Sequence, residues 1–375
     1  MGSETSFNSN ESKMKEIILS ILRYVSLPLA LLYGLVIFLR NKFYDWNIFS
    51  SMKFSLPVIS VGNLNVGGSG KTPMVEYLVN LLSPQFKIAT LSRGYGRKTK
   101  GFQIASEHDN ARTIGDEPFQ LFRKFGDKVI VAVGEERALA IPTILNEHPE
   151  VQVILMDDAF QHRAVVPQFS ILLTDYRKPF YKDFLLPFGR LREARTGAAR
   201  AHTIVVTKCI DLTEDNEERV RTSLKKIVGS LPVFFSETRY KAPMPIGHTN
   251  KLAEEVILVS GIAKNEPLEN EVSKYFKVPK HFKFPDHHVY TEGNIEVIHQ
   301  AAETHGINSI LTTEKDMVKL IAQPIFDSIK KKNWFYLPIH AAFIKNGSDF
   351  DALVSHMVID KLKEGPDAEN TETLS

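Results

Sequence analysis

The sequence predicts an α/β protein built on a parallel β-sheet with helices on both faces. Short apolar runs rich in β-branched residues alternate with helical patterns along most of the chain, and such runs are typical of strands that are covered on both sides. A glycine-rich turn also joins one of these runs to a helical pattern, which is the arrangement of a P-loop nucleotide-binding fold. We further expect a second, smaller α/β unit and an N-terminal membrane-associated helix.

Composition indicates a large enzyme with one apolar end. The chain has 375 residues, of which 43% are apolar and 24% charged, and its net charge is +2. This charge gives no general attraction to nucleic acid, so we expect no nucleic-acid partner. A single cysteine, Cys209, excludes an intramolecular disulfide and fits a reducing compartment. The polar ends, residues 1–13 and 361–375, are expected to be disordered.

The apolar end is the segment 14–43, where Arg23 interrupts the apolar run 17–39. The uninterrupted part, 24–39, is shorter than the roughly 20 residues that a spanning helix needs. Basic residues follow from Arg40 onward, where they can meet anionic lipid headgroups. We therefore favour a helix that lies in the membrane interface. A true span and a buried core helix are the alternatives.

The glycine-rich turn lies between an apolar run at 57–61 and a helical pattern that starts at Met74. In such a turn, backbone amides and the helix N-terminus bind phosphate oxygens. Lys71 is expected to reach the β- and γ-phosphates of ATP, and the Thr72 hydroxyl is expected to ligate Mg²⁺. The predicted nucleotide-binding residues are Asn65, Val66, Gly67, Gly68, Ser69, Gly70, Lys71 and Thr72.

One position departs from the usual pattern G-x-x-x-x-G-K-[ST], because Asn65 stands where the first glycine is expected. Asparagine tolerates a positive φ better than most other residues, so we expect the loop to bind nucleotide despite the change. The alternative is a structural glycine turn without a ligand.

Further apolar runs predict strands at 86–92, 128–133, 153–156, 170–174 and 203–207. Parallel sheets bind ligands at the carboxyl ends of their strands. Asp157 and Asp158 follow one of these runs directly, which is the pattern of an acid that holds Mg²⁺ beside a phosphate loop. The sequence does not separate the roles of the two carboxylates.

Other candidate site residues lie in three motifs. Asp116, in G-D-E-P, is either a helix N-cap or a base that accepts the proton of an acceptor hydroxyl, and sequence physics alone favours the cap. Arg93 lies in a basic glycine turn that either binds phosphate or is solvated. Arg190 and Arg192 belong to an arginine-rich stretch that suits an anionic substrate, with a charged surface as the alternative.

The chain changes character after its first set of strands. The linker K-A-P-M-P at 241–245 predicts a first unit over 44–240 and a second α/β unit over 241–360. The second unit contains D-H-H at 286–288. Nothing nearby completes the usual ligand set of a zinc site, so a histidine packed at a domain cleft is the simpler interpretation.

Taken in order, these motifs resemble one family, the tetraacyldisaccharide 4′-kinases of lipid A assembly. The motifs are GNLNVGGSGKTP, SRGYGR, GDEP, DDAFQH, LPFGRLRE, VVTK, SGIA, FPDHHVY and TTEKD. The resemblance implies two α/β/α domains with the active site between them. It implies transfer of the γ-phosphate of ATP, with Mg²⁺, to the 4′-hydroxyl of an acylated glucosamine disaccharide 1-phosphate. It also implies an N-terminal helix at the cytoplasmic face of the inner membrane.

The resemblance also assigns roles that the residues alone leave open. It implies that Asp116 is the catalytic base, that His287 from the second domain is its partner, and that Lys71 acts on the transferred phosphate. Arg93, Arg190 and Arg192 become secondary candidates for phosphate contacts.

Two other classes of function are alternatives. A membrane GTPase or ATPase switch would carry [NT]-K-x-D, whereas T-K-C-I-D at 207–211 has its acid one position late. A non-catalytic adaptor that keeps a phosphate loop as scaffold would have no need of Asp116, Asp157 or Asp158.

Overall fold

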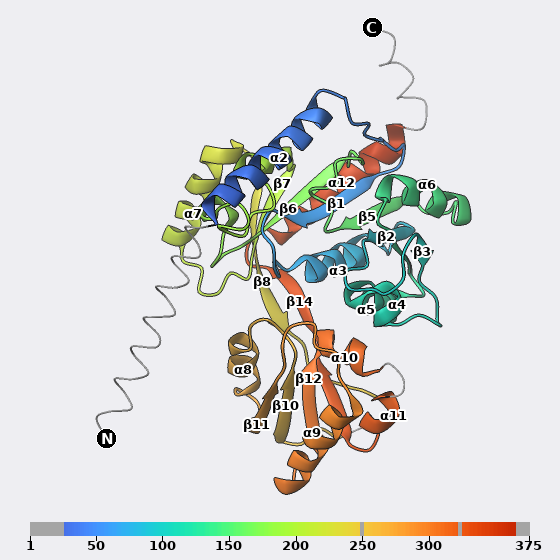
Figure 1. Cartoon of the computed structure of the whole chain (residues 1–375), viewed down its shortest axis with the longest axis vertical. Helices are drawn as coiled ribbons and strands as arrows, with labels where there is room; N and C mark the ends of the chain where they lie inside the picture. Colours follow the sequence, from blue (N-terminus) through green and yellow to red (C-terminus); the bar gives the residue numbers. More distant parts are fainter. Residues whose placement is uncertain (1–25, 248–250, 322–324, 365–375) are drawn as a thin grey trace.

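The computed structural model describes residues 26–247, 251–321 and 325–364, which form two β-sheets at opposite ends of the molecule (Figure 1). The larger sheet is mostly parallel and carries helices on both faces, and the smaller sheet forms a second α/β unit. The predicted fold class is confirmed. The predicted disordered ends lie outside the described residues except for 361–364, where the prediction is wrong because these residues form the last turn of a helix.

The larger sheet has nine strands in the order β14-β8-β7-β6-β1-β5-β2-β4-β3. Strands from β8 to β4 pair in parallel, and β14 and β3 are antiparallel edges. Their bounds are β1 Val58–Asn63, β2 Ile88–Ser92, β3 Gln103–Ile104, β4 Val129–Val133, β5 Val153–Asp157, β6 Phe169–Asp175, β7 Thr203–Thr207, β8 Val233–Tyr240 and β14 Ile339–Phe343.

Alternation along β1 explains how helices cover both faces. Ile59 and Val61 pack into a core with α3, α5 and α12, whereas Val58 faces a separate core with α6. Successive side chains of a strand point to opposite faces, so an apolar strand needs a cover on each side. The helices of this unit are α3 Lys71–Leu82, α4 Ala111–Ile114, α5 Asp116–Phe125, α6 Arg137–Glu147, α7 Glu214–Val228 and α12 Gly347–Glu364, with 3₁₀ turns η1 Phe180–Lys182 and η2 Arg195–Arg200.

The end of the chain returns to the first unit, which corrects the predicted domain boundary. β14 pairs with β8, and Phe350, Val354 and Val358 of α12 are buried in the same core as β1. Tyr77 Oη of α3 also donates to Asp351 Oδ1 at 2.7 Å. Residues 339–360 therefore belong to the larger unit, because their apolar side chains cover its sheet.

The smaller sheet has five strands in the order β11-β10-β12-β13-β9, and only β9 is antiparallel. The strands are β9 Met244–Pro245, β10 Glu255–Ser260, β11 Lys277–Lys283, β12 Ser309–Thr313 and β13 Asn333–Leu337. The helices are α8 Glu266–Val272, α9 Glu292–Thr304, α10 Glu314–Leu320 and α11 Ile325–Ile329. Trp334, which is fully buried, lies in its core.

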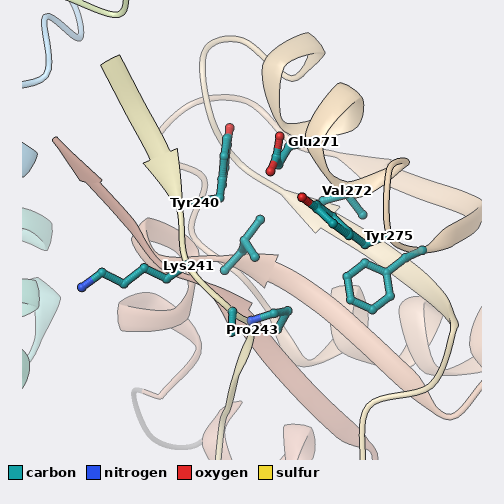
Figure 2. A pocket seen from close by; sticks show the side chains of 9 residues that line it. Tyr240, Lys241, Pro243, Glu271, Val272 and Tyr275 are labelled. Atoms are coloured by element: carbon teal, nitrogen blue, oxygen red, sulfur yellow. The ribbon is translucent and has the colours of Figure 1, made fainter. Parts of the chain in front are cut away.

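Two chain segments connect the units, one at Lys241 and one at Pro338. These segments lie side by side, since the Lys241 amide donates to the Pro338 carbonyl at 2.9 Å. A cavity of about 330 Å³ lies against the first of them (Figure 2). Tyr240, Lys241 and Pro243 line it from the linker, and Glu271 and Tyr275 line it from the second unit. Its lining includes no residue of the glycine-rich turn or the acidic pair.

The N-terminal helix is α2, Leu27–Asp45, which lies along the larger unit at the end remote from the smaller sheet (Figure 1). By length and composition alone it is apolar enough to cross a membrane. Only Ala30 of this helix is buried, so the alternative of a buried core helix is wrong. The part of the predicted segment before residue 26 lies outside the described residues.

Candidate active site

The glycine-rich turn joins the end of β1 to α3 near the middle of the larger sheet. Gly67 and Gly70 have φ values of 106° and 83°, a region that favours glycine. The end of β7 holds the turn from the side, since Thr207 Oγ1 donates to the Ser69 carbonyl at 2.8 Å and Lys208 Nζ donates to the Gly68 carbonyl. These contacts use carbonyl oxygens, so they do not compete for the amides that bind phosphate.

Asn65 has a different role from the predicted one. Its φ is not positive, so the explanation by tolerance of a left-handed backbone is wrong. Asn65 is buried and donates from Nδ2 to Asp183 Oδ2 at 2.8 Å, and its carbonyl accepts from Asn63 Nδ2 at 2.7 Å. The side chain therefore anchors the start of the loop to a neighbouring segment.

Lys71 begins α3 beside polar groups that hold its amine. Its Nζ lies 3.6 Å from Asp158 Oδ1 and 3.4 Å from Asn63 Oδ1. Thr72 follows it, half-buried in the first turn of α3. The Lys71 amine thus lies at the carboxyl end of β5. Phosphate oxygens of a bound triphosphate would compete there with Asp158 and Asn63 for its hydrogen bonds.

The pKa values of the two carboxylates after β5 are shifted in opposite directions. Burial raises the pKa of Asp157 to about 7, although Lys71 opposes this shift. Burial also acts on Asp158, but Lys71 and Arg192 outweigh it and lower the pKa of that carboxyl. Asp158 is therefore ionised and paired at neutral pH, whereas Asp157 is poised to gain or lose a proton.

The three candidate arginines lie in different places. Arg192 Nη1 donates to Asp158 Oδ1 at 2.8 Å, so the structure brings it to the acidic pair. Arg190 Nη2 instead pairs with Asp183 at 2.8 Å, and its carbonyl accepts from the Val66 amide at 2.8 Å. Arg93 is exposed just beyond the end of β2. Arg190 thus supports the phosphate loop from outside.

Asp116 is the first residue of α5, and the N-cap of this helix is Gly115, with a φ of 98°. The N-cap interpretation of Asp116 is therefore wrong. Its carboxylate instead reaches the second unit, where Asp116 Oδ2 lies 3.2 Å from His287 Nδ1. The next residue, Glu117, acts on the pKa of Asp157, which places this end of α5 close to the acidic pair.

His287 is held in one orientation by its neighbours. Lys315 Nζ lies 3.1 Å from His287 Nε2 and also 2.8 Å from Asp286 Oδ1. A lysine ammonium has only donors, so Nε2 must accept its hydrogen bond. In the neutral ring Nδ1 then carries the proton and donates to Asp116, while the ring of Tyr95 packs edge-on at 5.7 Å.

Several residues of this site were not predicted. Lys315 lies inside the quoted motif TTEKD without an assigned role, and Arg137 begins α6 after β4. Burial lowers the pKa of Arg137, while Asp158 and Asp157 oppose the shift. A charged residue at the start of the helix that follows a strand of a parallel sheet is the signal that could have found Arg137.

A glycine loop, its lysine and a buried acid on the adjacent strand define a P-loop nucleoside-triphosphate-binding protein. The Asp116–His287 contact joins a carboxylate of the larger unit to an imidazole of the smaller one. The chain belongs to the tetraacyldisaccharide-1-P 4′-kinase family, whose sequence model matches residues 22–358.

Relatives cover nearly all of the chain. A tetraacyldisaccharide 4′-kinase of Flavobacterium johnsoniae is 42% identical over 356 residues, which is 92% of this chain and 100% of the relative. One of Phocaeicola vulgatus is 40% identical over 331 residues, 85% of this chain and 90% of the relative. LpxK from Aquifex aeolicus, whose crystal structure is in complex with ATP, superposes with a TM-score of 0.70 at 29% identity, covering 90% of this chain and 99% of that one.

Proposed function

We propose that this protein is an ATP-dependent lipid kinase that transfers the γ-phosphate of ATP to the 4′-hydroxyl of tetraacyldisaccharide 1-phosphate, in lipid A biosynthesis. Membership of the family and the 42% identity to a tetraacyldisaccharide 4′-kinase support this activity. The structural observation that supports the proposal is the contact between Asp116 and His287, because a carboxylate held by an imidazole is suited to accept the proton of a hydroxyl.

ATP binds at the glycine-rich turn. The amides of residues 67–70 and the N-terminus of α3 receive its phosphates, whereas the Val66 amide is already bonded to the Arg190 carbonyl. Lys71 neutralises the β- and γ-phosphate oxygens. Arg192, and Arg93 from the end of β2, are placed to contact the phosphates of ATP or of the lipid. Arg190 acts indirectly, through the loop that it supports.

The residues at the end of β5 fit a magnesium ion. Asp157 Oδ1 is buried and has no hydrogen-bond partner within the described part of the chain, and an unpaired buried carboxylate oxygen is suited to a hard cation. Asp157 and the Thr72 hydroxyl would hold Mg²⁺, and Asp158 is the second candidate carboxylate. Such an ion would neutralise negative charge on the triphosphate.

Asp116 accepts the proton of the 4′-hydroxyl as the phosphoryl group transfers in line. His287 Nδ1 donates to Asp116 and fixes the rotamer of the carboxylate, and Lys315 fixes the tautomer of His287. Because Asp116 belongs to the larger unit and His287 to the smaller one, the base is complete only when the two units meet.

The acceptor is a lipid, and α2 supplies the surface that such a substrate requires. Large apolar side chains of this helix are exposed along one side: Leu29 60%, Leu31 68%, Leu32 60%, Leu35 53%, Val36 55% and Phe38 56%. Lys42 follows in the last turn of the helix. We infer that this side lies in the interface of the inner membrane at its cytoplasmic face, where ATP is present.

The test is transfer of label from γ-labelled ATP, with Mg²⁺, to the tetraacyl disaccharide 1-phosphate in detergent micelles. Wild-type protein is compared with Lys71→Ala and Asp116→Ala. We expect label on the lipid with wild type and loss of on the order of a hundredfold or more in each variant. Label released only as free phosphate, whether or not lipid is present, would place the protein among switch ATPases instead.

A further inference from the structure

Helix α2 has a second side, which docks on the larger unit with polar side chains. This side is formed by Ala30, Tyr33, Gly34, Arg40 and Asn41, at the spacing of three and four residues that places them on one face. The approach is close at Gly34, where a Cβ atom would lie 2.7 Å from Leu185 Cδ1. The helix is therefore fitted to the segment that carries Arg190 and Arg192.

A first chain of contacts runs from this docked side to the phosphate site. Tyr33 Oη donates to the Arg192 carbonyl at 2.7 Å. Arg192 Nη1 donates to Asp158 Oδ1 at 2.8 Å, and Asp158 Oδ1 lies 3.6 Å from Lys71 Nζ. The helix thus holds the backbone of an arginine that sets the position of the carboxylate facing the phosphate-binding lysine.

A second chain ends at the same lysine and meets the first at Gln161, whose Oε1 accepts from Arg192 Nη1 at 3.4 Å. Asn41 Nδ2 donates to Glu193 Oε2 at 3.2 Å, and Gln161 Nε2 donates both to Glu193 Oε1 and to the Asn63 carbonyl at 2.9 Å. The Asn63 side chain accepts from Lys71 Nζ at 3.4 Å. Arg40 Nη2 strengthens this route with a bond to the Gln161 carbonyl at 3.0 Å.

Glu193 connects Asn41 to Gln161 in the second chain of contacts. It is 1% exposed, and Arg200 Nη2 donates to both of its carboxylate oxygens at 2.8 Å. A buried carboxylate needs its partners, because an unmet hydrogen bond costs more in a low-dielectric site than in water. Displacement of Asn41 would therefore disturb Gln161 and Asn63 as well.

We propose that Tyr33 and Asn41 of α2 are positioning residues for phosphoryl transfer, and that a lipid surface on the exposed side of α2 strengthens nucleotide binding through them. The inference deepens the proposed function, on which it rests. A lipid surface that favours the docked position of α2 also favours the arrangement of Arg192, Asp158 and Asn63 around Lys71. Because Lys71 binds the phosphates, lipid and nucleotide then bind cooperatively.

The experiment measures the affinity of a fluorescent, non-hydrolysable ATP analogue with and without vesicles of phosphatidylethanolamine and phosphatidylglycerol. With wild type we expect vesicles to tighten binding by about fivefold or more. In Tyr33→Phe and in Asn41→Ala we expect this tightening to be lost while co-sedimentation with the vesicles is retained. In micelles we expect kcat to fall about fivefold in each variant, with the KM for lipid unchanged.

Tyr275→Phe and Asn146→Ala are matched controls, because both residues are exposed and lie far along the chain from α2. A purely structural role of Tyr33 or Asn41 would lower the folded fraction and with it every readout, which thermal melting of the same samples detects. Full vesicle-dependent tightening in both variants would overturn the proposal, and so would loss of vesicle binding equal to the loss of tightening. Since analogue binding needs no phosphate acceptor, a wild-type protein that labels no lipid would refute the proposed function without deciding this test.

Discussion

The phosphate loop and the Asp116–His287 contact lie at the same site but are held in different ways. The loop is supported by β7, by Asp183 and by the docked helix α2, all within the larger unit. The Asp116–His287 contact is one interaction of 3.2 Å between the units, and the His287 side chain is 38% exposed. The phosphate loop is thus held within one unit, whereas the Asp116–His287 contact depends on how the two units meet.

This difference separates binding from chemistry. Groups fixed by many neighbours are preorganised for the charge that they will meet. A pair shared between two units depends on how the units pack, here where Val318 of α10 joins Ile114 and Phe119 in one buried cluster.

The largest contrast is expected between Lys71→Ala and Asp116→Asn. Both variants should lose turnover, by on the order of a thousandfold for Lys71 and about a hundredfold for Asp116. Only Lys71→Ala should lose affinity for ATP, because the proposed role of Asp116 concerns the acceptor hydroxyl and not the phosphate loop. Isothermal titration with a non-hydrolysable analogue checks this, with Lys225→Ala on the exposed side of α7 as control. Equal loss of ATP affinity in both variants would contradict the separation.

A smaller effect is expected at Lys315, whose proposed role is to hold His287 and Asp286. Lys315→Met should lower kcat about tenfold, because His287 Nε2 loses its donor and the ring can take the other tautomer. Lys315→Arg should restore part of the activity, since a guanidinium also donates. The ¹⁵N shifts of His287 report the tautomer directly. An unchanged tautomer in Lys315→Met would refute the assigned role.

On the phosphate side, Asn65→Ala should raise the KM for ATP about fivefold and leave kcat nearly unchanged. The change removes the hydrogen bond to Asp183 and leaves a buried carboxylate oxygen without that donor. Steady-state kinetics over a range of ATP concentrations separates the two constants. If kcat fell and the KM did not change, Asn65 would belong to the chemistry and not to the loop scaffold.

The smallest effect concerns the stability of the second unit. Burial lowers the pKa of His299 to about 4, and Trp334 Nε1 donates to its Nε2 at 3.0 Å, so the folded ring stays neutral. In the unfolded chain His299 has an ordinary histidine pKa near 6.5, so it binds a proton that it does not bind in the folded protein. Stability is therefore complete above about pH 6.5 and falls as the pH drops toward 4, by at most about 1.4 kcal/mol per pH unit.

Urea unfolding at several pH values, followed by Trp334 fluorescence, measures this slope. Trp334 is buried and Trp46 is 61% exposed, so a Trp46→Phe background isolates the signal. His299→Gln should flatten the slope because it removes the titrating group. The same slope in that variant would show that other groups cause the acid sensitivity.

Much of the larger unit was predictable because its signals are local. The glycine loop, the strand before it and the acids after β5 are each encoded by a few consecutive residues, and the observed strands coincide closely with the predicted runs. The domain boundary was not predictable in this way. The local sequence of residues 339–360 does not indicate which sheet their apolar side chains cover. Their packing on β8 and α3 in the folded chain determines that they cover the larger sheet.

The residues of the candidate site also divide into those predicted from local sequence and those whose roles depend on distant partners. The residues of the phosphate loop were found by spacing, but the role of Asn65 was misjudged, since its partner Asp183 is 118 residues away in the chain. Asp116 read alone suggested a helix cap, because the residues that give it another role, His287 and Lys315, come from another unit.

The sequence by itself determined the fold class, the phosphate loop, the acidic pair and the apolar character of the N-terminal helix. These features depend on backbone conformation and on periodicity, which neighbouring residues set. The tertiary structure alone decided which carboxylate is paired, which tautomer His287 holds, and that α2 is linked to Lys71 by two chains of contacts. Those properties depend on burial and on partners distant in the chain, and both exist only once the chain has folded.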